Sequence, residues 1–520
     1  TYASPDFVKC LERLQNQEFG QVVEGAIDAN GYSISNVTLA VGLTYPACIN
    51  LCGSGNEAFN MDSFSQQLVT WLLPWLALIS QLPYGSNDVL KNFESMLLTV
   101  GSPMLAGYSL ALAITSNRWM VDRFGRSNYP NSILAAKVVS SLQQVLFSLP
   151  NEDHVLWSLV VLRENDEWWW RLANGLDYSS SRWTLAAIMS MVYVGLTYIL
   201  TWMTTFDTQS DQAAWPGGQS LGSLWLSLLP LVVCYLQLSP KSDVDRINAA
   251  LDHANELCFS SEENGEATQR RAPQTITVQT ACRSIVDEDK ICSTPVCFYA
   301  RFHGWFQIAL QLSNAFDTAS QRSRMGGMVP RTRPEIVETD GDADDRYHYD
   351  LVNIYVKSTL LAIFLQWGTT GAAVMAMYLT PTRGLGCFSG SLLLYGCVST
   401  LIWLCLVVSG VLAHSFAASQ NTRLRRFRVF GGLAVALRHT GKLLAAINTA
   451  WVFASAFLQF SNAESNCYCK AAALGLGNQA YAILGQVPAA KRYWAGGVIM
   501  ASGTALAFII AINILRKQPV

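Results

Sequence analysis

Cysteine is the residue type whose placement in this chain most directly predicts a chemistry, the formation of disulfides. Six of the 13 cysteines fall in segments that we expect to lie together on one side of a membrane: Cys10, Cys48, Cys52, Cys387, Cys467 and Cys469. An even number of cysteines on an oxidising side is typical of a disulfide framework. Cys467 and Cys469 form a C-x-C pair, and disulfide geometry favours a distant partner for each. Cys48 and Cys52 either bridge locally in a turn, or one of them ties down the N-terminal tail.

A glycosylation sequon, Asn36-Val37-Thr38, lies in the same stretch as three of these cysteines. A sequon is used on an exposed segment of a protein that enters the secretory pathway. The sequence starts at Thr1 without an apolar leader, so we expect either a removed signal peptide or a fragment. Residues 1–63 are therefore predicted to form an extracellular or lumenal tail with Asn36 as its glycosylation site.

Other patterns that could carry chemistry do not reach a recognisable site. The sequence has no H-E-x-x-H motif, no Walker loop and no Ser-His-Asp grouping. Asp340, Asp342 and Asp344 are spaced like calcium ligands, but Asp345 and Leu351 occupy positions that need Gly and Glu. Four further cysteines lack zinc-site spacing and are expected to be reduced thiols: Cys258, Cys282, Cys292 and Cys297. We therefore predict no catalytic residue, no metal and no cofactor.

The composition indicates a membrane protein. Hydrophobic residues make up 51% of the chain and charged residues 14%, against about 25% charged in a soluble domain. Sixteen tryptophans are present, and tryptophan favours the membrane interface. The formal net charge of −2 excludes a general nucleic-acid-binding role, which needs a concentrated basic surface.

Apolar segments of about 20 residues, enough to cross a bilayer as helices, recur along the chain. Seven clear segments are found at about 96–115, 183–205, 221–239, 354–380, 391–418, 443–460 and 495–515. An eighth, 67–83, is short and contains Pro74, so it either crosses with a kink or is re-entrant. The predicted fold is an all-α polytopic membrane bundle of seven or eight spans with interfacial amphipathic helices. Its two helix groups, 64–239 and 354–520, flank a long, partly disordered cytoplasmic segment, 240–353.

Lysine and arginine placement predicts the topology. Loops 116–182, 240–353 and 419–442 and the C-terminus are basic and expected to be cytoplasmic, whereas 206–220, 381–390 and 461–494 are expected outside. If 67–83 crosses fully, the N-terminal tail is cytoplasmic. If it does not cross, the tail is outside, which suits the sequon and the six cysteines and is preferred.

Two stretches are predicted to lie at the membrane surface. Trp168, Trp169 and Trp170 are adjacent and cannot share one helix face, so we expect them at the headgroup level. A basic amphipathic segment leads into the span at 443–460 and is expected to contact anionic lipid headgroups on the cytoplasmic leaflet. Its basic residues are Arg423, Arg425, Arg426, Arg428, Arg438 and Lys442. A plain cytoplasmic loop is the alternative interpretation.

The stretch TWLLPWLALISQLPYGSNDVL, followed by LLTVGSPMLAGYSLALAITSNRWM, resembles a group of uncharacterised multi-pass proteins of filamentous fungi. The resemblance covers roughly residues 64–120. It implies a cleaved signal sequence and a fungal membrane, and it implies no activity.

Three functions remain open for a protein of the plasma membrane or a secretory-pathway membrane. The favoured one is a non-enzymatic protein that organises a membrane region or an assembly, as a homo-oligomer or with a membrane-protein partner. A channel or facilitative transporter for a neutral or lipidic solute is suggested by Pro74, Pro103 and Pro230 in apolar segments, although the span centres offer only Gln366 and Asn448 as polar groups. A receptor-like seven-span protein is the third.

Overall fold

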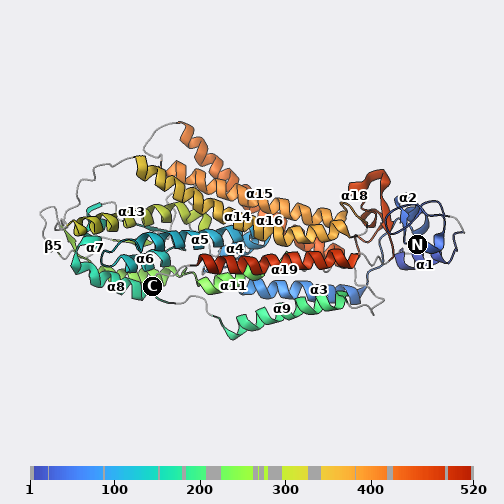
Figure 1. The fold of residues 1–520 in the computed structure, drawn as a ribbon, viewed down its shortest axis with the longest axis horizontal. Coiled ribbons are helices and arrows are strands. Elements are labelled where there is room, and N and C mark those ends of the chain that lie inside the picture. The colour runs from blue at the N-terminus through green and yellow to red at the C-terminus, as the bar shows by residue number, and fades with distance from the viewer. Residues whose placement is uncertain are drawn as a thin grey trace.

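The structure is a computed structural model that describes residues 5–20, 23–85, 88–149, 153–178, 183–206, 224–261, 267–268, 275–278, 296–325, 341–380, 382–418, 425–485 and 490–516. These residues are mostly helical and form an elongated molecule (Figure 1). The N-terminus lies at one end, in a small subdomain called the cap, which consists of residues 5–60 and 461–485. A cluster of shorter helices, called the distal domain, forms the opposite end, and long helices connect the two (Figure 1).

Four helices are long and apolar enough to cross a membrane, which is consistent with an integral membrane protein. They are α14 (Gly341–Leu379), α15 (Cys387–Ala418), α16 (Arg425–Phe460) and α19 (Ala490–Leu515). Each covers a span predicted in the second helix group. α16 is one continuous helix that includes the basic segment from Arg425 onward as well as the predicted span at 443–460.

The first helix group differs from the prediction. α3 (Met61–Ser80) covers most of 67–83, and α9 (Leu185–Phe206) covers 183–205. α11 (Leu228–Leu238) has only 11 residues where a span at 221–239 was predicted, and 221–223 lie outside the described residues. Among the described residues there are four candidate spans, or five if one bent pair counts as a span, so seven or eight spans are not confirmed.

The predicted span at 96–115 is broken. α4 (Val89–Gly101) and α5 (Pro103–Phe124) meet at Ser102 with a bend of 104°. Pro103 has no backbone N–H, so it cannot continue α4, but its fixed φ suits the first position of a new helix. Ser102 caps that helix, because its Oγ accepts a hydrogen bond from the Leu105 N–H at 3.2 Å.

The distal domain packs onto the long helices through one continuous apolar core. Its elements are α6 (Ser132–Ser141), α7 (Asp153–Val161), η2 (Arg163–Asn165), α8 (Asp166–Gly175), α12 (Val244–Asn255) and α13 (Phe298–Arg324), with strands β3 (Phe147–Ser148), β4 (Ser260–Ser261), β5 (Ala267–Thr268) and β6 (Thr277–Val278). α13 packs against α5 and buries Phe298, Phe302 and Phe306. The segment 240–353 therefore contributes a packed helix, α13, to the bundle.

The cap joins two distant parts of the chain in one three-stranded sheet. β2 (Gly42–Thr44) pairs antiparallel with β1 (Ala26–Ile27) and with β7 (Tyr481–Ile483), with Leu43 opposite Ala482. The other elements are α1 (Phe7–Gln15), η1 (Val37–Leu39), α2 (Tyr45–Cys52), α17 (Cys467–Lys470), α18 (Ala473–Leu476) and η4 (Gly477–Gln479). They enclose an apolar core of their own. The N-terminal tail is thus a folded unit with the segment that precedes α19.

Candidate functional site

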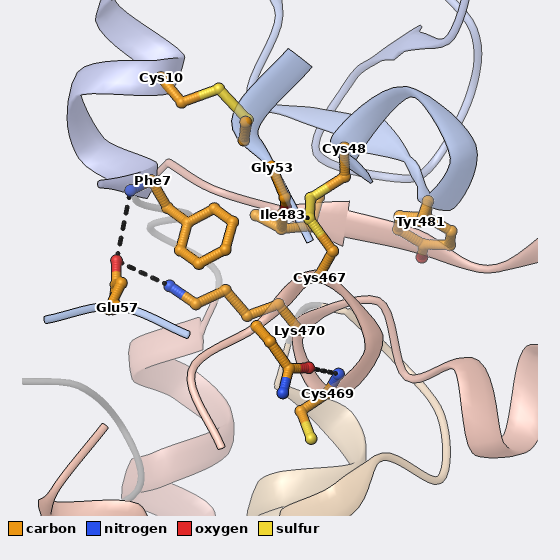
Figure 2. The surroundings of a disulfide bond; sticks show 12 residues. Phe7, Cys10, Cys48, Gly53, Glu57, Cys467, Cys469, Lys470, Tyr481 and Ile483 are labelled. Atoms are coloured by element: carbon orange, nitrogen blue, oxygen red, sulfur yellow. Dashed lines mark hydrogen bonds and ion pairs between the residues drawn. A yellow bond between two sulfur atoms is a disulfide. The ribbon is translucent and has the colours of Figure 1, made fainter. Parts of the chain in front are cut away.

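Three disulfides hold the cap together, and they use all six cysteines predicted from the sequence. The pairs are Cys10–Cys52, Cys48–Cys467 and Cys387–Cys469. Cys467 and Cys469 each bind a distant partner, as expected, and Cys48 ties the tail to the segment before α19 rather than bridging to Cys52. Figure 2 shows the Cys48–Cys467 bond, which joins α2 to α17. The cap is therefore cross-linked to itself and, through Cys387, to the start of α15.

A buried ion pair lies beside these disulfides. The Lys470 Nζ is 3.3 Å from the Glu57 Oε1, and the Lys470 side chain is 2% exposed. Glu57 also accepts hydrogen bonds from the Phe7 N–H at 3.3 Å and from the Ser465 hydroxyl at 2.6 Å. The ammonium group lies 4.2 Å from the centre of the Phe7 ring, in the range of a cation–π contact (Figure 2). Burial lowers the pKa of Lys470 to about 8, against the opposing effect of Glu57.

This pKa predicts that the cap becomes more stable at alkaline pH. The pKa of Lys470 is about 8 in the folded cap and 10.5 in an unfolded chain, so the unfolded chain binds more protons between these values. The free energy of unfolding should rise by about 3 kcal/mol across this interval and fall back as the pH drops through 8. Pulse proteolysis of the full-length protein in urea, repeated from pH 7 to pH 10, measures the change.

The matched variants are Lys470→Met, which should remove the pH-dependent rise, and Lys9→Met, which changes an exposed lysine of the same cap and should keep it. Identical pH profiles for Lys470→Met and the unaltered protein would contradict the assignment.

Asn36 is exposed on the cap and begins the short helix η1. Its Oδ1 accepts hydrogen bonds from the Thr38 N–H at 3.1 Å and from the Thr38 hydroxyl at 2.7 Å. The sequon is thus accessible and its two polar side chains are in contact.

The interfacial position predicted for the tryptophans is wrong for two of the three. Trp168 and Trp169 are fully buried in the distal domain, and only Trp170, 57% exposed, faces outward. The Trp168 Nε1–H donates to Asn255 Oδ1 at 3.2 Å, and the Trp169 Nε1–H donates to the Leu159 carbonyl at 2.8 Å. The prediction failed because α12 and α7 supply polar partners for both indoles, which no local pattern reveals.

The basic segment does not form a separate surface helix, since it is the first part of α16. Arg438 is 1% exposed and lies one turn beyond Ala434, whose carbonyl accepts from Ser409 of α15. Lys442 forms an ion pair with Glu94 of α4 at 2.8 Å. A lipid-facing role is therefore wrong for Arg438, and Lys442 binds within the bundle. Arg423 lies outside the described residues, as do the side chains of Arg425, Arg426 and Arg428.

Two further expectations from the sequence concern the segment 240–353. Cys297 is disulfide-bonded, so the expectation of a reduced thiol is wrong there, whereas Cys258 is free and buried. Asp340 and the side chains of Asp342 and Asp344 lie outside the described residues. In the part of the chain that the structure describes, no group of three or more His, Cys, Asp or Glu could hold a metal ion.

The break between α4 and α5 gathers buried polar groups from three other helices. The Asn448 side-chain amide of α16 donates to the Gly101 carbonyl at 2.7 Å and to the Tyr395 carbonyl at 3.2 Å. The Tyr395 hydroxyl donates to the Val100 carbonyl at 2.6 Å, so the carbonyls freed at the end of α4 are satisfied. This second candidate site is called the helix break.

The helix break also includes the other polar residue found in a span centre. The Ser102 hydroxyl donates to the Ser399 carbonyl at 2.8 Å. The Ser399 hydroxyl donates to Gln366 Oε1 at 3.3 Å, and the Gln366 amide donates to the Thr370 hydroxyl at 3.0 Å. The sequence singled out Gln366, Asn448 and Pro103 separately, and the fold brings them together. Tyr395, Ser102 and Ser399 were missed because an isolated serine or tyrosine in an apolar helix carries no local signal.

Comparisons with protein-family models, with curated proteins and with solved structures found no match to this chain. The fold and the two sites therefore define it as a helical membrane-type protein with a disulfide-linked cap.

Proposed function

We propose that this chain is a non-enzymatic integral membrane protein that organises a membrane region or a protein assembly through its cap. The observation that carries the proposal is the cross-linking of the cap. Cys10–Cys52 closes the N-terminal tail, Cys48–Cys467 joins the tail to the segment before α19, and Cys387–Cys469 joins that segment to α15. A surface held rigid in this way loses little conformational entropy when a partner binds. The cap thus suits recognition better than it suits a moving gate.

Exposed apolar side chains on the cap support the same role. Tyr32 is 72% exposed, Leu39 is 69% exposed and Leu474 is 56% exposed, although each belongs to a folded, disulfide-linked unit. Aromatic residues are enriched at protein interfaces, where they bury large areas at low entropic cost. These side chains are the groups we expect a partner, or a second copy of the chain, to cover.

Native mass spectrometry of the protein released from nanodiscs tests the organising role. We expect a homo-oligomer or a co-purified membrane protein, and we expect Tyr32→Ser combined with Leu39→Ser to release it. Exchanging Lys9 and Arg13, which are also exposed on the cap, for alanine is the matched control and should leave the assembly intact. A stable monomer that is indifferent to lipid and to these substitutions would refute the proposal.

We propose further that the cap is extracytoplasmic and that Asn36 carries a glycan. Expression in a eukaryotic secretory host should give a protein whose gel mobility increases after treatment with peptide N-glycosidase F. Asn36→Gln should abolish this shift, whereas Thr38→Ser, which preserves the sequon, should retain it. Absence of any shift in the unaltered protein would argue for a cytoplasmic cap.

The proposed location is the plasma membrane or a secretory-pathway membrane, with the end of α16 that lies farther from the cap on the cytoplasmic side. Arg425, Arg426 and Arg428 lie in its first turns, where they are proposed to contact anionic headgroups. Floating the protein with vesicles that contain or lack phosphatidylserine tests this contact.

A channel or facilitative transporter for a neutral solute is the second candidate, and the helix break is the observation that suggests it. Broken helices form the solute sites of many transporters because they free backbone groups inside the membrane. Here those groups are bound by Asn448 and Tyr395, which favours a closed, structural break. Solute flux into proteoliposomes that is lost on altering the break would reverse the preference. The receptor-like alternative rested on seven spans, and the described residues supply four or five.

A further inference from the structure

A small cavity lies beside the helix break and is lined by residues of α3, α5 and α11, each of which contains a proline. Its volume is about 10 Å³, which is close to the space that one water molecule needs. Trp71 and Trp75 of α3, Pro103 of α5, Ser227 and Leu228 at the start of α11, and Tyr395 of α15 contribute to its wall. No charged residue lines it, so the site suits an uncharged guest.

Trp71, which lines this cavity, carries a buried hydrogen-bond donor. Its side chain is 2% exposed, and its ring stacks on Trp75 at 6.3 Å and meets Phe453 edge-on at 5.8 Å. Among the described residues, no protein atom accepts a hydrogen bond from the Trp71 Nε1–H. A buried donor without an acceptor destabilises the folded state, so an acceptor in the cavity would stabilise the fold.

Two hydroxyl oxygens on the same wall can accept hydrogen bonds. The Tyr395 hydroxyl donates its proton to the Val100 carbonyl at 2.6 Å, and the Ser227 hydroxyl donates to the Leu224 carbonyl at 2.8 Å. Each hydroxyl oxygen keeps lone pairs that can accept a further hydrogen bond. The wall therefore offers one donor and two acceptors, and a buried water typically uses two to four such partners.

We infer that this cavity binds one water molecule. The guest oxygen accepts from the Trp71 Nε1–H and donates to the Tyr395 or the Ser227 hydroxyl oxygen. The guest links α3 to α11 and α15 at the level of the helix break. This site is independent of the proposed organising role, because it lies in the bundle and not in the cap.

NMR of the full-length protein in nanodiscs, with its tryptophans labelled with ¹⁵N at the indole nitrogen, tests the inference. Trp71→Phe removes one indole resonance and so assigns it, and Trp75→Phe assigns its stacked neighbour as a matched control. We expect a rotating-frame Overhauser effect between the Trp71 indole proton and its guest. A cross-peak at the water frequency identifies water, and a cross-peak to carbon-bound protons that belong to no protein residue would show a larger guest and overturn the inference.

The competing arrangement is an N–H donated to an aromatic face, since Phe453 and Phe460 both meet Trp71 edge-on. It predicts an indole proton shifted upfield by the ring current and no cross-peak to water or solute. That result would overturn the inference. If Trp71→Phe folds poorly, sequential assignment of the unaltered protein identifies the Trp71 indole resonance among those of the 16 tryptophans, and the test still holds.

Discussion

Replacing Cys48 and Cys467 together by serine is expected to lower the free energy of unfolding of the cap by about 2–5 kcal/mol. The bond joins residues separated by 419 positions, the longest separation among the three cap disulfides. A cross-link stabilises mainly by restricting the unfolded chain, and the restriction grows with the length of the loop that it closes. The intervening helices limit that loop when they remain in the membrane, which is why we expect a value inside the usual range for disulfides.

Pulse proteolysis of the full-length protein in urea measures the change at neutral pH. Cys397→Ser is the matched control, because Cys397 is a free, exposed cysteine and its loss should leave the midpoint unchanged. Cys10→Ser with Cys52→Ser breaks a bond across only 42 positions and should cost less. Equal midpoints for the Cys48/Cys467 variant and the unaltered protein would show that the sheet and the ion pair, rather than the disulfide, hold the tail in place.

Gly101→Ala is expected to destabilise the helix bundle by about 3 kcal/mol. A Cβ at this position would lie 2.3 Å from the Ala445 carbonyl oxygen and 2.9 Å from the Ala445 Cα, and both are backbone atoms of α16. Backbone atoms cannot turn aside as a side chain does, so α4 and α16 must separate. Separation also stretches the hydrogen bond from Asn448 to the Gly101 carbonyl, which satisfies the broken end of α4.

Thermal unfolding in nanodiscs, followed by far-ultraviolet circular dichroism, gives the comparison. Gly432→Ala is the control. Gly432 lies in α16, the helix that contains Ala445, and a Cβ at Gly432 would have no neighbouring atom within 4 Å. This substitution should be neutral or stabilise by up to about 1 kcal/mol, because alanine favours a helix over glycine. A Gly101→Ala protein as stable as Gly432→Ala would mean that α4 and α16 do not pack closely, and that the helix break is mobile.

These two variants separate the two candidate sites. The disulfide variant should loosen the cap without altering the bundle, and Gly101→Ala should do the reverse, because the cap has an apolar core of its own. If the cap is the binding surface, the disulfide variant should weaken the assembly. If the helix break carries solute, Gly101→Ala should reduce the flux.

The sequence by itself determined the features that depend on local composition. α14, α15, α16 and α19 followed from runs of apolar residues, because the part of a helix that crosses hydrocarbon must be mostly apolar to be stable there. The set of six cap cysteines followed from charge asymmetry and from the positions of the spans. Pro103 marked a possible kink, since proline acts on the backbone of its own helix.

Only the tertiary structure decided what depends on distant neighbours. The pairing of Cys48 with Cys467 requires two segments, 419 positions apart, to meet in one sheet, and six cysteines allow many pairings. Trp168 and Trp169 are buried because α12 and α7 accept their indole protons, and Arg438 turns inward because α15 packs on its face of α16. A polar side chain is stable inside a protein only where the fold supplies its partner, and the sequence does not state where that partner lies.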